Sequence, residues 1–166
     1  MSNSKVINDY LLKFSSFLFY LIPITLLTGP FLPDLIIVLV DIMFLIIIFN
    51  ERNFYYFKNY FFYIFFVFNL FLIFSSINSE YMLFSLKSSL VYFRFTLFAL
   101  ATWMLIDRNK NLIKVFSLAL FSSILIASID GFYQYFNDIN IFGFDTVFPN
   151  RLNLLFNDKA VLGGYL

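Results

Sequence analysis

Residues 34–49 read DLIIVLVDIMFLIIIF, a run in which Asp34 and Asp41 are the only charged residues. A helix that crosses the hydrocarbon layer of a bilayer needs roughly 20 mostly apolar residues, and this run comes close to that length. It does not alternate between apolar and polar residues, as a strand of a membrane barrel does. The stretch therefore predicts a membrane-spanning helix.

The composition of the whole chain points to the same class of protein. Of 166 residues, 61% are hydrophobic and 13% are charged, whereas a soluble domain carries a charged fraction of about 25%. The other long apolar runs cover residues 14–28, 59–77, 87–106 and 112–129. In lipid, a helix satisfies its backbone hydrogen bonds within one segment. We therefore expect an all-α integral membrane protein, a multi-span bundle of five transmembrane helices.

The last part of the chain has a different character. Gly, Pro, Asn and Asp punctuate residues 130–158, which predicts a loop with short amphipathic pieces. Asp158 is placed to cap a further helix that begins at Lys159, and the sequence stops at Leu166. We expect a single transmembrane domain, residues 1–166, that is the N-terminal part of a larger polytopic protein with the start of a sixth helix.

Basic residues give the orientation of the spans. They are concentrated before the first span, after the second and after the fourth, and are nearly absent from the connections on the other side. Because Lys and Arg favour cytoplasmic loops, the N-terminus is predicted in the cytoplasm and the loop over 130–158 outside. The first span has a basic flank without a small-residue cleavage site, so we interpret it as an uncleaved anchor.

Three polar residues interrupt the spans: Asp41, Asn69 and Arg94. Each lies seven or eight residues from the outer end of its span, or roughly 10–12 Å deep at about 1.5 Å per residue. An isolated charge at such depth costs at least about 2.5 kcal/mol. One hypothesis is an Asp41–Arg94 pair, with Asn69 nearby, lining a cavity open to the outer face. The alternatives are a helix-to-helix clasp without a ligand, or an Arg94 side chain that snorkels outward.

The chain contains neither Cys nor His, so disulfides, thiolate chemistry and the commonest general base and metal ligand are excluded. No catalytic residue can be assigned, and we expect no metal, no cofactor and no nucleic-acid partner. Arg151 is the only arginine of the predicted loop. A guanidinium can grip phosphate oxygens through two parallel N–H bonds. Arg151 is thus a candidate for binding a lipid-linked pyrophosphate, or else an interfacial contact with lipid headgroups.

A combination of short motifs resembles the N-terminal half of the O-antigen ligase family, which is related to the O-antigen polymerases. The matching positions are Asp130, Tyr133–Gln134, Ile141–Gly143, Arg151–Leu152, Phe156, Asn157–Asp158 and Leu162–Leu166. The chain departs from the family pattern at Leu154, where glycine is usual, and at Lys159, where a small or polar residue is frequent.

This resemblance implies a glycosyltransferase of lipopolysaccharide biosynthesis in the bacterial inner membrane. Its donor would be an undecaprenyl-pyrophosphate-linked glycan, and its acceptor the lipid A core or another glycan at the periplasmic face. The residues predicted to bind pyrophosphate are Arg151 and Arg94, with Asp41, Asn69, Asp130 and Gln134 in support. The later arginine and the histidine of the family have no counterpart here, so the fragment is expected to be inactive alone.

Other readings of the sequence stay open. The related polymerase would extend the same carrier-linked glycan. A small transporter or channel subunit would use Asp41 and Arg94 on its pathway, and a structural membrane protein would have no chemistry at all.

Overall fold

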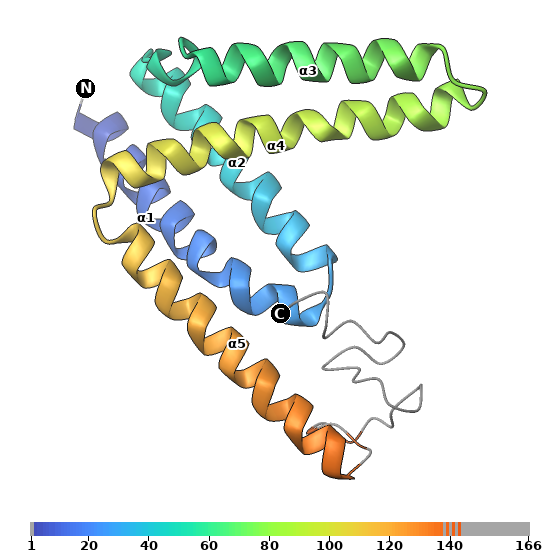
Figure 1. The fold of residues 1–166 in the computed structure, drawn as a ribbon. Helices are drawn as coiled ribbons and strands as arrows, with labels where there is room; N and C mark the ends of the chain where they lie inside the picture. The colour runs from blue at the N-terminus through green and yellow to red at the C-terminus, as the bar shows by residue number, and fades with distance from the viewer. Residues whose placement is uncertain (1, 138, 140, 142, 144–166) are drawn as a thin grey trace. The chain divides into compact units, whose positions relative to one another are not determined.

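The computed structural model describes residues 2–137 together with residues 139, 141 and 143. In chain order the helices are α1 (Ser2–Thr25), the short 3-10 helix η1 (Leu26–Thr28), α2 (Phe31–Glu51), the short 3-10 helix η2 (Tyr55–Phe57), α3 (Tyr60–Ile77), α4 (Met82–Arg108) and α5 (Leu112–Asn137) (Figure 1). These described residues contain no β-strand, and five of their helices are long and apolar enough to cross a membrane. The prediction of an all-α, multi-span membrane protein is confirmed.

Several helices extend beyond the predicted spans. Helix α1 begins at Ser2 rather than at residue 14, and α4 begins at Met82 rather than at residue 87. Helix α5 continues to Asn137, so the loop predicted over 130–158 begins later than expected. The predicted ranges covered only the apolar windows, whereas a helix keeps its internal hydrogen bonds in its polar turns as well.

The structure divides into two compact units. Unit 1 comprises Met1–Ser16 and Ile37–Lys110, and unit 2 comprises Phe17–Ile36 and Asn111–Leu166. Helices α1 and α2 each contribute one segment to each unit, whereas α3 and α4 belong to unit 1 and α5 to unit 2. The three polar residues predicted at membrane depth therefore all fall in unit 1.

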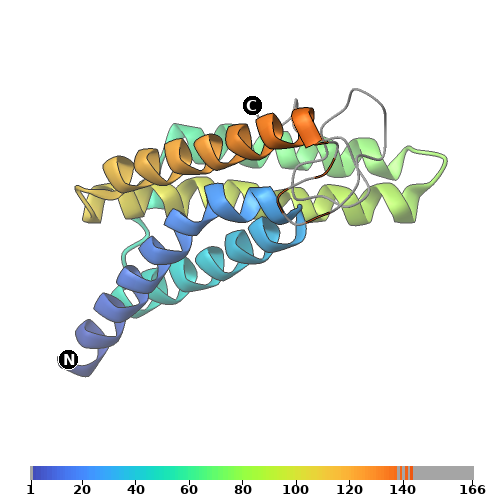
Figure 2. The ribbon, with the colours of Figure 1, turned by 90° about the horizontal axis from the view of Figure 1, so that it is seen from below.

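Helices α3 and α4 lie side by side as an antiparallel hairpin in unit 1 (Figures 1 and 2). The side chain of Asn59 caps the start of α3 by accepting a hydrogen bond from the N–H of Phe61 at 3.2 Å. Polar contacts then join the two arms: Asn69 with Thr96 at 3.0 Å, Ser76 with Ser89, and Ser79 with Ser85 at 2.9 Å. Hydrogen bonds between membrane helices contribute roughly 0.6–2 kcal/mol each, so these contacts hold the hairpin together.

The buried core of unit 1 comes from apolar side chains of α2 and α4. Phe44, Ile47, Ile48, Leu100, Met104 and Leu105 are each at most 4% exposed. In unit 2, the ring centroids of Phe19 on α1 and Phe116 on α5 lie 5.0 Å apart. By contrast, α3 exposes large aromatic side chains such as Phe61 and Phe71. Lipid accepts such a surface, because apolar side chains gain nothing by turning away from hydrocarbon.

Helix α2 ends in a Schellman motif at Arg52. The N–H of Arg52 donates to the carbonyl of Phe49, and the N–H of Asn53 donates to the carbonyl of Ile48, both at 3.3 Å. Arg52 has a φ of 51°, which lies in the left-handed region that favours glycine. A residue with a side chain gives up about 1 kcal/mol or more in this conformation, so Arg52 occupies a position that is locally unfavourable for it.

Candidate functional site

Asp41, on α2, is a carboxylate buried inside unit 1. It is 5% exposed, and neither of its oxygens accepts a hydrogen bond from any described residue. Arg94, on α4, is close enough for its positive charge to act on Asp41. The two groups nevertheless make no direct ion pair among the described contacts. The guanidinium carbon of Arg94 lies 4.8 Å from the centroid of the Phe95 ring. The structure thus brings the two charges into the same region without joining them.

Asn69, the third residue predicted at membrane depth, makes its hydrogen bonds within the α3–α4 hairpin. Its Nδ2 donates to the carbonyl of Phe65 at 2.7 Å and to the hydroxyl of Thr96 at 3.0 Å. Asn69 is 5% exposed and Thr96 is 3% exposed. The described contacts give Asn69 no hydrogen bond to Asp41 or Arg94. For this residue the geometry favours the helix-to-helix clasp, with Thr96 as the partner that sequence reasoning did not identify.

In unit 2, Asp130 and Gln134 form a buried polar pair near the end of α5. Each is 1% exposed, and Gln134 Nε2 donates to Asp130 Oδ2 at 3.2 Å. The other carboxylate oxygen, Oδ1, accepts a hydrogen bond from the backbone N–H of Ile141 at 2.9 Å. Residues four apart lie on one face of a helix, so α5 itself aligns the pair. Asp130 was interpreted as the start of a loop, whereas here it ties the last turns of α5 to the segment that follows.

Arg151 lies outside the described residues, as do the remainder of the family-like pattern from Phe144 onward and the predicted start of a sixth helix at Lys159. Pyrophosphate binding by Arg151 therefore stays a prediction from the sequence.

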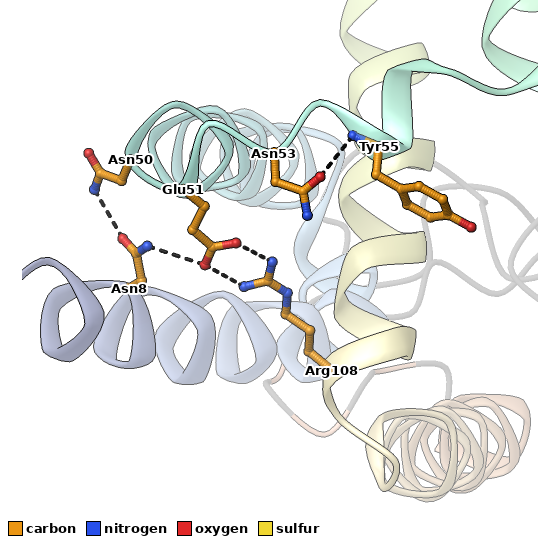
Figure 3. Close-up of polar contacts among 6 residues, drawn as sticks. All are labelled: Asn8, Asn50, Glu51, Asn53, Tyr55 and Arg108. Carbon is orange, nitrogen blue, oxygen red and sulfur yellow. Dashed lines mark hydrogen bonds and ion pairs between the residues drawn. The ribbon is translucent and has the colours of Figure 1, made fainter. Parts of the chain in front are cut away.

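Sequence reasoning missed a cluster where α1 begins and where α2 and α4 end. We call Asn8, Asn50, Glu51 and Arg108 the end cluster (Figure 3). The Arg108 guanidinium grips the Glu51 carboxylate with two bonds, Nη1 to Oε1 at 2.7 Å and Nη2 to Oε2 at 2.5 Å. Asn8 Nδ2 donates to Glu51 Oε1 at 3.2 Å and its Oδ1 accepts from Asn50 Nδ2 at 3.0 Å. Three helices of unit 1 are thereby tied together.

An aromatic group stands beside the end cluster. The Trp103 ring lies 5.5 Å from that of Tyr56, at an interplanar angle of 83°, and 6.0 Å from that of Tyr55. The N–H of Tyr55 donates to Asn53 Oδ1 at 3.2 Å (Figure 3). Burial raises the pKa of the Tyr56 hydroxyl, although Arg108 acts against that rise. Tyr and Trp are enriched at the boundary between membrane and water. The ends of helices that are long enough to cross a membrane are expected at the same boundary.

The described residues contain no group of three or more His, Cys, Asp or Glu side chains placed to hold a metal. No protein-family model, curated protein or solved structure was found to match this chain.

Proposed function

We propose that this chain is the N-terminal part of an O-antigen ligase-like glycosyltransferase of the bacterial inner membrane. It moves a glycan from an undecaprenyl-pyrophosphate carrier to an acceptor such as the lipid A core at the periplasmic face. In this orientation the N-terminus is cytoplasmic and Arg151 is periplasmic, as the distribution of basic residues favours.

The observation that carries this proposal is the hydrogen bonding of Asp130. Asp130, Gln134 and Ile141 are three of the positions that give the chain its resemblance to the family. One carboxylate accepts hydrogen bonds both from the Gln134 side chain, one helical turn away, and from the backbone N–H of Ile141, eleven residues further along the chain. A carboxylate that accepts such bonds fixes the chain as it leaves α5. This hydrogen bonding supports a defined backbone path from the end of α5 to Ile141, which precedes the segment that contains Arg151.

In the proposed reaction, the oxygen of an acceptor hydroxyl forms a bond to the anomeric carbon of the donor glycan. The bond from that carbon to the pyrophosphate breaks, and negative charge gathers on the leaving group. A guanidinium held beside that charge lowers the barrier, which is the role proposed for Arg151 and Arg94. The resemblance assigns the base that takes the acceptor proton to a histidine of a later external loop, which these 166 residues do not include.

The related polymerase reaction uses the same donor with a glycan as acceptor, and these residues do not separate the two. One observation favours a function of another class. A buried carboxylate without a hydrogen-bond partner, as Asp41 is among the described residues, is typical of ion or proton pathways through membranes. A transporter would lose its activity with Asp41→Asn, whereas in the proposed transferase Asp41 has only a supporting role beside Arg94, so that Asp41→Asn should lower glycan transfer without abolishing it.

The decisive experiment measures glycan transfer by the complete gene product in cells that lack their own activity. We expect Arg151→Ala to abolish the attachment of glycan to the lipid A core. Arg151→Lys should restore little of it, because an ammonium cannot grip a pyrophosphate with two parallel bonds. Arg52→Ala, which removes an arginine from the predicted cytoplasmic side, is the matched control and should leave transfer intact.

Equal membrane levels of all variants would show that the loss is not one of insertion. Normal transfer by Arg151→Ala would refute the role of Arg151, and a topology reporter placing Arg151 in the cytosol would refute the whole proposal.

A further inference from the structure

The end of unit 1 that holds the end cluster also carries an excess of exposed positive charge. Lys5 lies in the first turns of α1, and Arg52 follows the end of α2. Lys58 precedes α3, and Lys110 follows α4. All four side chains are exposed, and none makes an ion pair with a described residue. We call Lys5, Arg52, Lys58 and Lys110 the basic rim.

The acidic residues at this end do little to balance the basic rim. Asp9 pairs with Lys13 at 3.0 Å, and Glu51 is held by both arms of Arg108. Within the described part of unit 1, this leaves Asp107 as the one acidic side chain at this end outside an ion pair. Four uncompensated cations therefore stand against one carboxylate, and the surplus is a property of the folded unit rather than of the chain, whose net charge is +1.

A groove gives this surface room for a bound group. It has a volume of about 530 Å³ and is lined by Ser4, Lys5, Asn8, Asp9, Leu12, Asn50, Glu51 and Arg108. The volume lies within the range of roughly 300–1,000 Å³ that is common for small-molecule sites. Within the lining, Asp9 and Glu51 are each held in an ion pair, with Lys13 and Arg108 respectively. Lys5 belongs to both the groove and the basic rim, and it is the charged side chain of the lining that makes no ion pair with a described residue.

The neighbouring aromatic side chains place this end at the boundary of the membrane. The Trp103, Tyr55 and Tyr56 rings contact one another next to Arg108, and such rings prefer the depth of the lipid headgroups. Arg52 keeps its charge at a position where glycine would relieve backbone strain. A cluster of cations at the depth of the headgroups is what binding to anionic headgroups requires.

We infer that the basic rim and its groove bind the headgroups of anionic phospholipids in the leaflet that faces this end. Each Lys or Arg near an anionic membrane surface strengthens the association about fivefold. The inference is independent of the proposed glycan transfer, because it involves neither Arg151 nor a carrier lipid. It also predicts that the interaction weakens as salt screens the charges.

Trp103 provides the measurement, because it is the only tryptophan of the chain and lies beside the end cluster. The 166-residue chain is reconstituted in phosphatidylcholine vesicles that contain a small fraction of phosphatidylglycerol with brominated acyl chains. Bromine quenches tryptophan only on close approach. Parallel vesicles contain the same fraction of brominated phosphatidylcholine. The ratio of the two quenching constants reports how far the anionic lipid is enriched at Trp103.

We expect a ratio clearly above one at low salt and a ratio near one at high salt. Arg52→Gln should lower the low-salt ratio by up to about fivefold, and the variant that changes all four rim residues to Gln should bring it to one. Lys87→Gln is the matched control, since Lys87 is an exposed lysine near the start of α4, away from this end. That variant should leave the ratio unchanged.

Unchanged Trp103 emission and unchanged quenching by brominated phosphatidylcholine would show that the variants are folded. The inference is overturned if the native chain gives a ratio of one, if the fourfold variant keeps the native ratio, or if Lys87→Gln lowers it as much as Arg52→Gln does.

Discussion

The bond between Arg108 and Glu51 permits a quantitative test of how unit 1 is held together. Both side chains are partly buried, with 27% of Arg108 and 28% of Glu51 exposed. Fully exposed ion pairs contribute about 0–1 kcal/mol, whereas breaking a fully buried pair costs about 3–5 kcal/mol. The Arg108–Glu51 pair lies between these limits, because it is bidentate and partly buried and because Asn8 is an additional donor to Glu51. Arg108→Gln, which removes the guanidinium, should therefore lower the free energy of unfolding by about 2 kcal/mol.

The assay is reversible unfolding by sodium dodecyl sulfate in mixed micelles, followed through Trp103 fluorescence. A double-mutant cycle with Glu51→Gln and Arg108→Gln should give a coupling energy of about 1.5 kcal/mol. Asp9 and Lys13 form the matched control, because they are 65% and 72% exposed and lie four residues apart on one helix. Their cycle should give about 0.3–0.5 kcal/mol. A coupling energy for Glu51 and Arg108 no larger than that of the control would refute the reasoning.

Three further predictions use the same unfolding measurement or limited proteolysis. Arg52→Gly should stabilise the chain by about 1 kcal/mol, because glycine adopts the left-handed conformation at the end of α2 without strain; a destabilised variant would contradict this. Thr96→Val should cost roughly 0.6–2 kcal/mol, because it removes the acceptor of the Asn69 amide; Thr102→Val, a change at a hydroxyl without a described partner, is the control. Asp130→Asn should weaken the hydrogen bond from the Ile141 N–H by about 1–3 kcal/mol and thereby increase the rate of proteolytic cleavage after Asn137. An unchanged cleavage rate would show that Asp130 does not hold the end of α5 to the segment that follows.

The apolar runs were sufficient to predict the membrane spans, because hydrophobic length is a local property of the sequence. The ends of the helices were less predictable. Asp130 resembles a loop residue when its neighbours are unknown, but Gln134 and Ile141 satisfy its carboxylate in the folded chain. Helix α5 can therefore continue to Asn137.

The partners of the polar residues could be predicted only in part. A pair between Asp41 and Arg94 was one of three hypotheses, based on their shared depth, and depth alone does not say which faces of two helices meet. Asn69 instead donates a hydrogen bond to the hydroxyl of Thr96, a small side chain that does not stand out as a partner within an apolar span. Arg108 is one of the basic residues after the fourth predicted span that give the chain its predicted orientation. Its two hydrogen bonds to Glu51 depend on how the ends of α2 and α4 come together, which the sequence does not show.

The α3–α4 hairpin also bears on how the chain is inserted during synthesis. Asn69 can donate to Thr96 only when both helices are present. Until α4 has emerged from the ribosome, the Asn69 amide of α3 has only the Phe65 carbonyl of its own helix as an acceptor, and the rest of this polar group faces hydrocarbon. We expect the translocon to retain α3 and to release the two helices laterally as a pair. Nascent chains arrested before α4 should crosslink to the translocon, and those arrested after it should crosslink to lipid.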